Sequence, residues 1–219
     1  MSASATQVNL GLRLLDDQLF DSDEHRCGRV DDIQLKGGPG TRTEVSALLV
    51  GPGAWTGRLR RPFAYPVEGL GPDYMHCIPW SEVVRVGTSV GLSRPARELG
   101  LETNDGRSVQ WVGAPPQGTM RVSELLRSRL VTSSGLELGR VWDVRAERQT
   151  QLPDEHVNEA WRVTGLITGS AGWQERIGVS PEDDATQGED FTSWDSVIEL
   201  GPGNVTIADP DSLARRQRP

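Results

Sequence analysis

The most constraining feature of this sequence is an internal repeat. Residues 14–33 correspond without a gap to residues 125–144, and both copies share a leading Leu-Leu, a Gly-Arg-Val and an Asp two positions later. Two further pairs of segments match in the same order, 45–49 with 163–167 and 80–86 with 194–200. A solenoid needs at least about three shorter units, so this pattern predicts two homologous domains.

The spacing of the repeated blocks predicts where these domains lie. We expect domain 1 at 9–92 and domain 2 at 119–209, each of about 90 residues and large enough to hold a modest core. The linker 93–118 is expected to contain a hairpin, and the basic tail 210–219 is expected to be disordered. Two domains of equal shape can pack as a pseudo-twofold pair within one chain, which we expect here.

The repeated segments have the pattern of strands. We expect 12–20 and 26–35 to form a hairpin with its tip at 21–24, because the second copy carries Ser-Ser-Gly at that place. Gly28 and Gly139 are predicted to lie at bulges that bend each strand. Several short strands joined by turns are typical of small barrels or sandwiches, so we expect an all-β protein of two tandem, strongly bent, mostly antiparallel barrels.

Composition and charge narrow the classes of partner. The chain has 36% hydrophobic and 25% charged residues and a net charge of −8. This charge disfavours direct nucleic-acid binding, which needs a basic face. We find no apolar run long enough to span a membrane and no signal peptide at the start, so we expect a cytoplasmic protein with reduced cysteines.

The repeated motifs resemble those of the PRC-barrel family. The resemblance is carried by the Leu-Leu opening, the Gly-Arg-Val-x-Asp segment and the Ile-Pro-Trp-Ser-Glu-Val-Val-Arg-Val run at 78–86, and it covers about 9–92 and 119–209. It implies small, bent, mostly antiparallel β-barrels that serve as docking or assembly modules rather than catalysts. The chain lacks the transmembrane helix and the different N-terminal barrel of known members, so their specific functions do not transfer.

Two groups of residues have side chains that could bind a metal ion. Asp21, Asp23 and Glu24 resemble the start of a calcium loop, but His25 and Arg26 break the EF-hand spacing. A second group has the side-chain chemistry of a zinc site, namely His25, Cys27, His76 and Cys77. Its spacing is unusual, and the alignment of one cysteine with Leu138 indicates a buried apolar position. We therefore predict no metal and no cofactor.

Tryptophans are the strongest candidates for partner binding. Trp80 and Trp194 recur beside the last strand pair of each copy, which predicts core packing. Trp55 and Trp173 recur just beyond a Gly-rich turn, where we expect the chain to leave the barrel. Because aromatic residues dominate binding hot spots, we select these last two as candidate partner anchors.

These observations favour a non-catalytic cytosolic adaptor or assembly module that docks on a larger protein complex, which could lie at a membrane face. The three histidines have no recognisable nucleophile context, so no catalytic residue is predicted. One alternative is a metal- or small-ligand-binding protein or enzyme that uses the inter-domain cleft. Another is a ribosome-assembly protein that binds a ribosomal protein. The sequence leaves the partner and the oligomeric state open.

Overall fold

The protein is built mainly from β-strands, as the sequence predicts. The computed structural model describes residues 5–51, 53–54, 75–101, 117–149, 161–168 and 190–209. Across these ranges, strands joined by tight turns and short helices make up the regular structure. None of the helices described is long and apolar enough to cross a membrane.

The two repeats contain the same elements in the same order. The first repeat consists of β1 (Ala5–Asn9), α1 (Leu10–Leu14), β2 (Gln18–Phe20), β3 (Arg26–Arg29), β4 (Asp32–Lys36), β5 (Glu44–Val50), β6 (His76–Pro79), η1 (Trp80–Glu82), β7 (Val83–Val86) and β8 (Val90–Leu92). The second consists of β9 (Thr119–Arg121), α3 (Val122–Leu125), β10 (Arg129–Thr132), β11 (Glu137–Gln149), β12 (Arg162–Thr168), β13 (Asp190–Ser193), η3 (Trp194–Ser196), β14 (Val197–Gly201) and β15 (Asn204–Ile207). The long strand β11 covers the positions that β3 and β4 divide between them.

Backbone geometry repeats along with the elements. Gly28 has a φ of 139° and Gly139 a φ of 132°, and each lies beside the register shift of its hairpin. These glycines adopt a region of φ that side chains disfavour, which explains why both copies keep glycine there. The predicted bulges are therefore confirmed, and so is the hairpin of β2 and β3.

One part of the predicted hairpin is wrong. Residues Leu12 to Leu14 form the end of helix α1 instead of continuing the strand that begins the hairpin. The helix has no side-chain cap from its own N-cap residue. Its first turn is capped from the other repeat, because Asp143 accepts the backbone N–H groups of Gly11 at 2.6 Å and Leu12 at 2.8 Å. A cap that is 131 residues distant leaves no local signal in the sequence.

The repeats exchange their opening segments. Strand β1 of the first repeat pairs antiparallel with β11 of the second, and β9 of the second pairs antiparallel with β4 of the first. The caps are reciprocal as well, since Asp32 accepts the backbone N–H of Ser123 in α3 at 3.1 Å and the Ser123 hydroxyl. Reciprocal contacts of this kind are expected when two halves are related by a two-fold axis.

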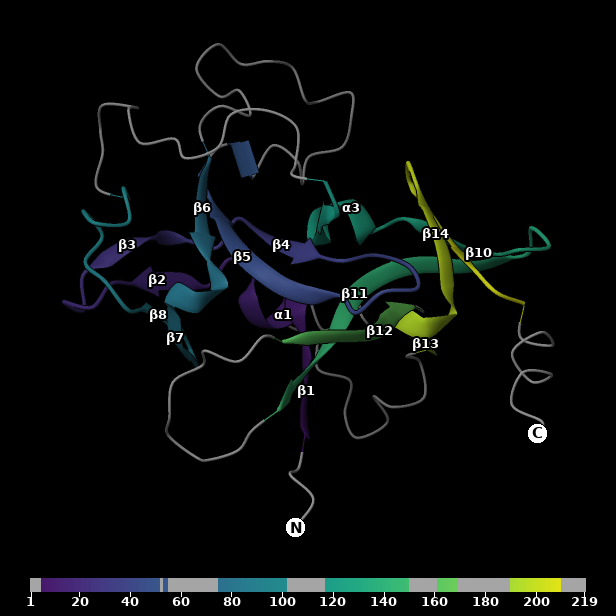
Figure 1. Cartoon of the computed structure of the whole chain (residues 1–219), viewed down its shortest axis with the longest axis horizontal. Coiled ribbons are helices and arrows are strands. Elements are labelled where there is room, and N and C mark those ends of the chain that lie inside the picture. Colours follow the sequence, from purple (N-terminus) through teal and green to yellow (C-terminus); the bar gives the residue numbers. More distant parts are fainter. Residues whose placement is uncertain are drawn as a thin grey trace, which may run out of the picture.

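The approximate axis passes between β5 and β12. The Val45 N–H donates to the Trp161 carbonyl at 2.9 Å, and the Val163 N–H donates to the Thr43 carbonyl at 2.8 Å. This contact joins both repeats in one curled 11-stranded sheet, and β3, β2, β8 and β7 form a separate 4-stranded sheet. The 4-stranded sheet and the β10–β14 region lie at opposite ends of the molecule (Figure 1). The predicted domain bounds, 9–92 and 119–209, remain predictions, because strand pairing crosses between the repeats.

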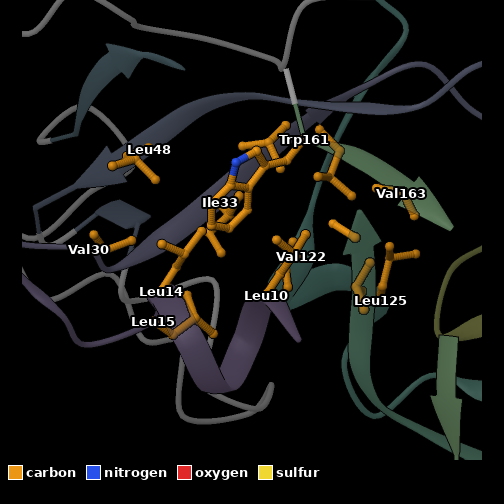
Figure 2. Close-up of a cluster of buried hydrophobic side chains, with 14 of the residues drawn as sticks. Leu10, Leu14, Leu15, Val30, Ile33, Leu48, Val122, Leu125, Trp161 and Val163 are labelled. Carbon is orange, nitrogen blue, oxygen red and sulfur yellow. The ribbon is translucent and has the colours of Figure 1, made fainter. Parts of the chain in front are cut away.

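A single hydrophobic core fills the junction. Figure 2 shows Leu10, Leu14 and Ile33 of the first repeat packed in one cluster with Val122 and Trp161 of the second. All five are at least 98% removed from solvent. Burial of side chains of this size contributes about 1.5–3 kcal/mol each to folding, so the two repeats stabilise each other.

The predicted core tryptophans also lie at this junction. Trp80 and Trp194 are 4% and 3% exposed, which confirms their packing role. Trp80 makes an edge-to-face contact with Trp161 at 5.0 Å between ring centroids. Trp194 donates from its ring N–H to the Thr43 hydroxyl at 3.0 Å. Each repeat thus places its tryptophan against the other repeat.

We predict that Asp143→Ala lowers the free energy of unfolding by about 1–3 kcal/mol, because three backbone N–H groups lose a buried acceptor. Urea unfolding followed by tryptophan fluorescence measures this change. The matched control is Asp195→Ala, which removes an exposed carboxylate from η3 and should change stability by less than about 0.5 kcal/mol. Equal stability of the two variants would contradict the role of the reciprocal caps.

Candidate functional site

The sequence-predicted partner anchors cannot be placed in the fold. Trp55 and Trp173 lie outside the described residues. Their role as anchors therefore stays a prediction. The candidate site consists of other residues, which lie on the outer surface of the second repeat.

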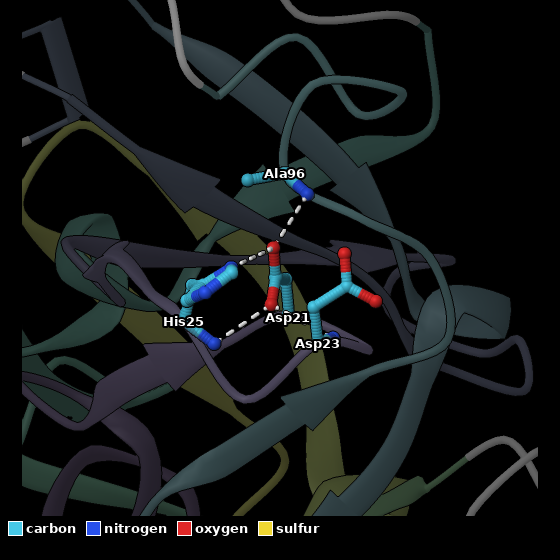
Figure 3. A network of polar contacts seen from close by, with 4 residues as sticks. All are labelled: Asp21, Asp23, His25 and Ala96. Atoms are coloured by element: carbon cyan, nitrogen blue, oxygen red, sulfur yellow. Dashed lines mark hydrogen bonds and ion pairs between the residues drawn. The ribbon is translucent and has the colours of Figure 1, made fainter.

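An acidic cluster at the tip of the first hairpin has the side-chain chemistry of a metal site. Asp21, Asp23 and His25 offer ligand atoms within 4.8 Å of one another. However, the buried Asp21 carboxylate already accepts the backbone N–H groups of Asp23 and His25 on one oxygen and that of Ala96 on the other (Figure 3). These bonds, that of Ala96 first, lower the pKa of Asp21.

The second repeat gives this cluster a structural explanation. The residue equivalent to Asp21 is Thr132, whose hydroxyl accepts the N–H of Leu136 as Asp21 accepts that of His25. Both side chains close the turn of a hairpin. A side chain with this role in both copies holds the loop together, and the turn accounts for the position of the Asp21 carboxylate.

The second group of candidate metal ligands, for which we predict no metal, does not form a cluster in the part of the chain that the structure describes. Among the described residues, the group of His25, Cys27, His76 and Cys77 does not bring three ligand atoms within 4.8 Å. Cys27 is half-buried beside the β3 bulge and packs against the main core. Cys77 packs in a smaller cluster with Leu49 and Met75. The two thiols therefore occupy separate packing environments.

The outer surface of the β14–β15–β10–β11 sheet exposes apolar side chains at two β-bulges. Strand register aligns Glu199, Thr206, Val131 and Glu137 across the four strands, and the bulge residues Ile198 and Leu138 lie next to the two glutamates. Ile198 is 52% exposed and Leu138 is 40% exposed. With strands about 4.8 Å apart, the row spans about 14 Å. We call Ile198, Thr206, Val131 and Leu138 the apolar row.

On the equivalent surface of the first repeat, an arginine lies over a glycine. The position of Thr206 is occupied by the buried Gly91, and the Arg85 side chain lies directly over it. A Cβ atom at Gly91 would lie 3.2 Å from the Arg85 Nε and 3.3 Å from its Cβ. The Arg85 guanidinium reaches Glu24 at 3.5 Å, so an arginine crosses the surface from β7 to the hairpin tip.

The second repeat does not have the residues of the Arg85–Glu24 ion pair. The positions of Arg85, Gly91 and Glu24 are occupied by Glu199, Thr206 and Gly135. A glutamate cannot pair with glycine, and the threonine side chain fills the space over which the arginine lies. The two homologous surfaces therefore differ. In the first repeat, Arg85, Gly91 and Glu24 line an open pocket, whereas the second repeat leaves Ile198 and Leu138 exposed.

Sequence reasoning missed this surface and misplaced one of its residues. The alignment of Leu138 with Cys27 predicted a buried position, but Leu138 is exposed because the adjacent bulge turns it outward. A usable signal was present in the repeat itself. The first copy has His25 and Cys27 where the second has two leucines, Leu136 and Leu138, and Leu136 is 62% exposed.

Comparisons with known proteins add no identity. A scan against protein-family models matches no family, and a search of curated proteins finds no matching relative.

We predict slow alkylation of Cys27. Burial, first, and the nearby Asp21 carboxylate together raise the pKa of this thiol to about 11. Because the thiolate is the reactive form, iodoacetamide should modify Cys27 at least about tenfold more slowly than free cysteine at pH 8. The rate should still be rising between pH 9 and pH 10. Peptide mass spectrometry resolves the two cysteines, and a rate that levels off below pH 9 would contradict the assigned environment.

Proposed function

We propose that this protein is a non-catalytic adaptor that docks on a protein partner through the apolar row of its second repeat. The observation that carries this proposal is the exposure of Ile198 and Leu138 on a surface where the first repeat has an arginine over a glycine. Large exposed apolar side chains that share one surface are typical of interaction sites. The adaptor role is also the one that the resemblance to PRC-barrel domains implies.

We describe the chain as a tandem pair of small PRC-type barrels that share their opening strands. The equal order of elements in both repeats, the parallel pairing of β2 with β8 and of β10 with β15, and the curled sheet support this description. The proposed location is the cytoplasm, where the protein attaches to a larger complex. This complex could lie at a membrane face.

The scaffold suits such a role because its two ends are rigidly connected. The shared core and the exchanged strands fix the second repeat against the first. A binding surface at one end is then held at a constant position relative to the other end, and little conformational entropy is lost when a partner binds.

We predict that Ile198→Gln together with Leu138→Gln abolishes the specific retention of a partner in a tagged pull-down from the native cell. Loss of two apolar anchors should weaken binding by at least about tenfold. Leu12→Gln is the matched control, because Leu12 is 49% exposed but lies on α1, away from the row. Quantitative mass spectrometry of soluble and detergent-solubilised fractions compares the three proteins.

The control variant should retain the same partner as the unchanged protein. Equal retention by the double variant would show that the apolar row is not the docking surface. In that event, the predicted anchors Trp55 and Trp173 become the next residues to change.

A further inference from the structure

Two arginines lie opposite each other beside the apolar row. Arg129 on β10 and Arg140 on β11 are direct cross-strand partners, and both are exposed. On β10, Arg129 lies two residues before Val131, which is about 7 Å along the strand. Among the described residues, neither guanidinium takes part in an ion pair.

This arginine pair is unfavourable for the isolated fold. Like charges directly opposite on antiparallel strands destabilise a sheet. In the first repeat, the equivalent pair is Gln18 and Arg29, and Gln18 donates to the backbone carbonyl of Gly28. The second repeat therefore carries an additional, uncompensated positive charge at this point, in a chain whose net charge is −8.

We propose that the partner segment bound on this face presents a carboxylate to Arg129 and Arg140 and apolar side chains to the row. This inference rests on the proposed function and specifies the chemistry of the partner. Two adjacent guanidinium groups can each donate two hydrogen bonds to carboxylate oxygens, which relieves their mutual repulsion. The apolar row alongside then receives the neighbouring side chains of the same segment.

The charges around the row favour a short protein segment over an extended anionic surface. Glu199 lies at the β14 end of the row and Glu137 at the β11 end, and both are exposed. A lipid bilayer or a nucleic acid would bring phosphates against these carboxylates as well as against the arginines. A peptide segment can place a carboxylate at the arginine pair alone. Its neutral or basic groups can then lie over the two glutamates.

The test is a titration of the isotopically labelled full chain, followed by amide chemical shifts in NMR. The probes are two capped six-residue peptides that share one leucine and one isoleucine and carry either two glutamates or two lysines. Inorganic phosphate and vesicles of mixed anionic and neutral phospholipid are the further probes. We expect the glutamate peptide to shift amides of β10, β11, β14 and β15 and to bind at least about fivefold more tightly than the lysine peptide.

Variants identify the residues responsible. Arg129→Gln together with Arg140→Gln should remove the preference for glutamate and leave the spectrum of the folded chain otherwise intact. The matched control is Arg26→Gln together with Arg29→Gln on the first repeat, where both arginines are exposed and no preference should be lost.

Equal affinity for the two peptides, or a preference that survives in the Arg129→Gln, Arg140→Gln variant, would overturn the inference. Stronger shifts of these strands by phosphate or by vesicles would overturn it in favour of a phosphate-bearing ligand. The pull-down keeps the two proposals separate. A partner lost with Ile198→Gln and Leu138→Gln but fully retained by the arginine variant supports the adaptor function and rejects the carboxylate.

Discussion

The structure depends on two carboxylates that each cap a helix of the opposite repeat. Asp143 accepts N–H groups from α1, and Asp32 accepts donors from α3. Burial raises the pKa of Asp32, and hydrogen bonds from Ser123 and from the Ile33 N–H oppose that rise. These caps fix the exchanged segments, and the exchanged segments close one core over both repeats. Removing either carboxylate would therefore affect the whole chain and not one domain.

The repeat also provides an internal comparison for function. Both copies share backbone geometry at equivalent positions, such as the positive φ of Gly28 and Gly139, so they impose similar surfaces. Several differences between those surfaces are differences of side chain. Arg85 lies over Gly91 in the first repeat, whereas the second repeat exposes Ile198 and Leu138. The core and the caps are retained in both copies, so this difference has no evident structural purpose, and the proposed docking role is based on it.

Local pattern in the sequence predicted local structure well. The bulge glycines and the buried Trp80 and Trp194 follow from side-chain chemistry within a few residues, and the structure confirms them. The helix at Leu12 was missed because its cap, Asp143, is distant in sequence. The pairing of β1 with β11 was missed for the same reason, since either repeat offers an equivalent strand. Leu138 was assigned to the core because residue type alone does not show which way a bulge turns a side chain.

Hydrogen–deuterium exchange of the full chain, with and without the partner isolated by the pull-down, tests the central claim most directly. The claim is that the outer surface of the second repeat is the docking face. It predicts slower exchange in β10, β11, β14 and β15 on binding, and unchanged exchange in their counterparts β2, β3, β7 and β8. Protection of the first-repeat strands, with no change in the second repeat, would contradict the assignment.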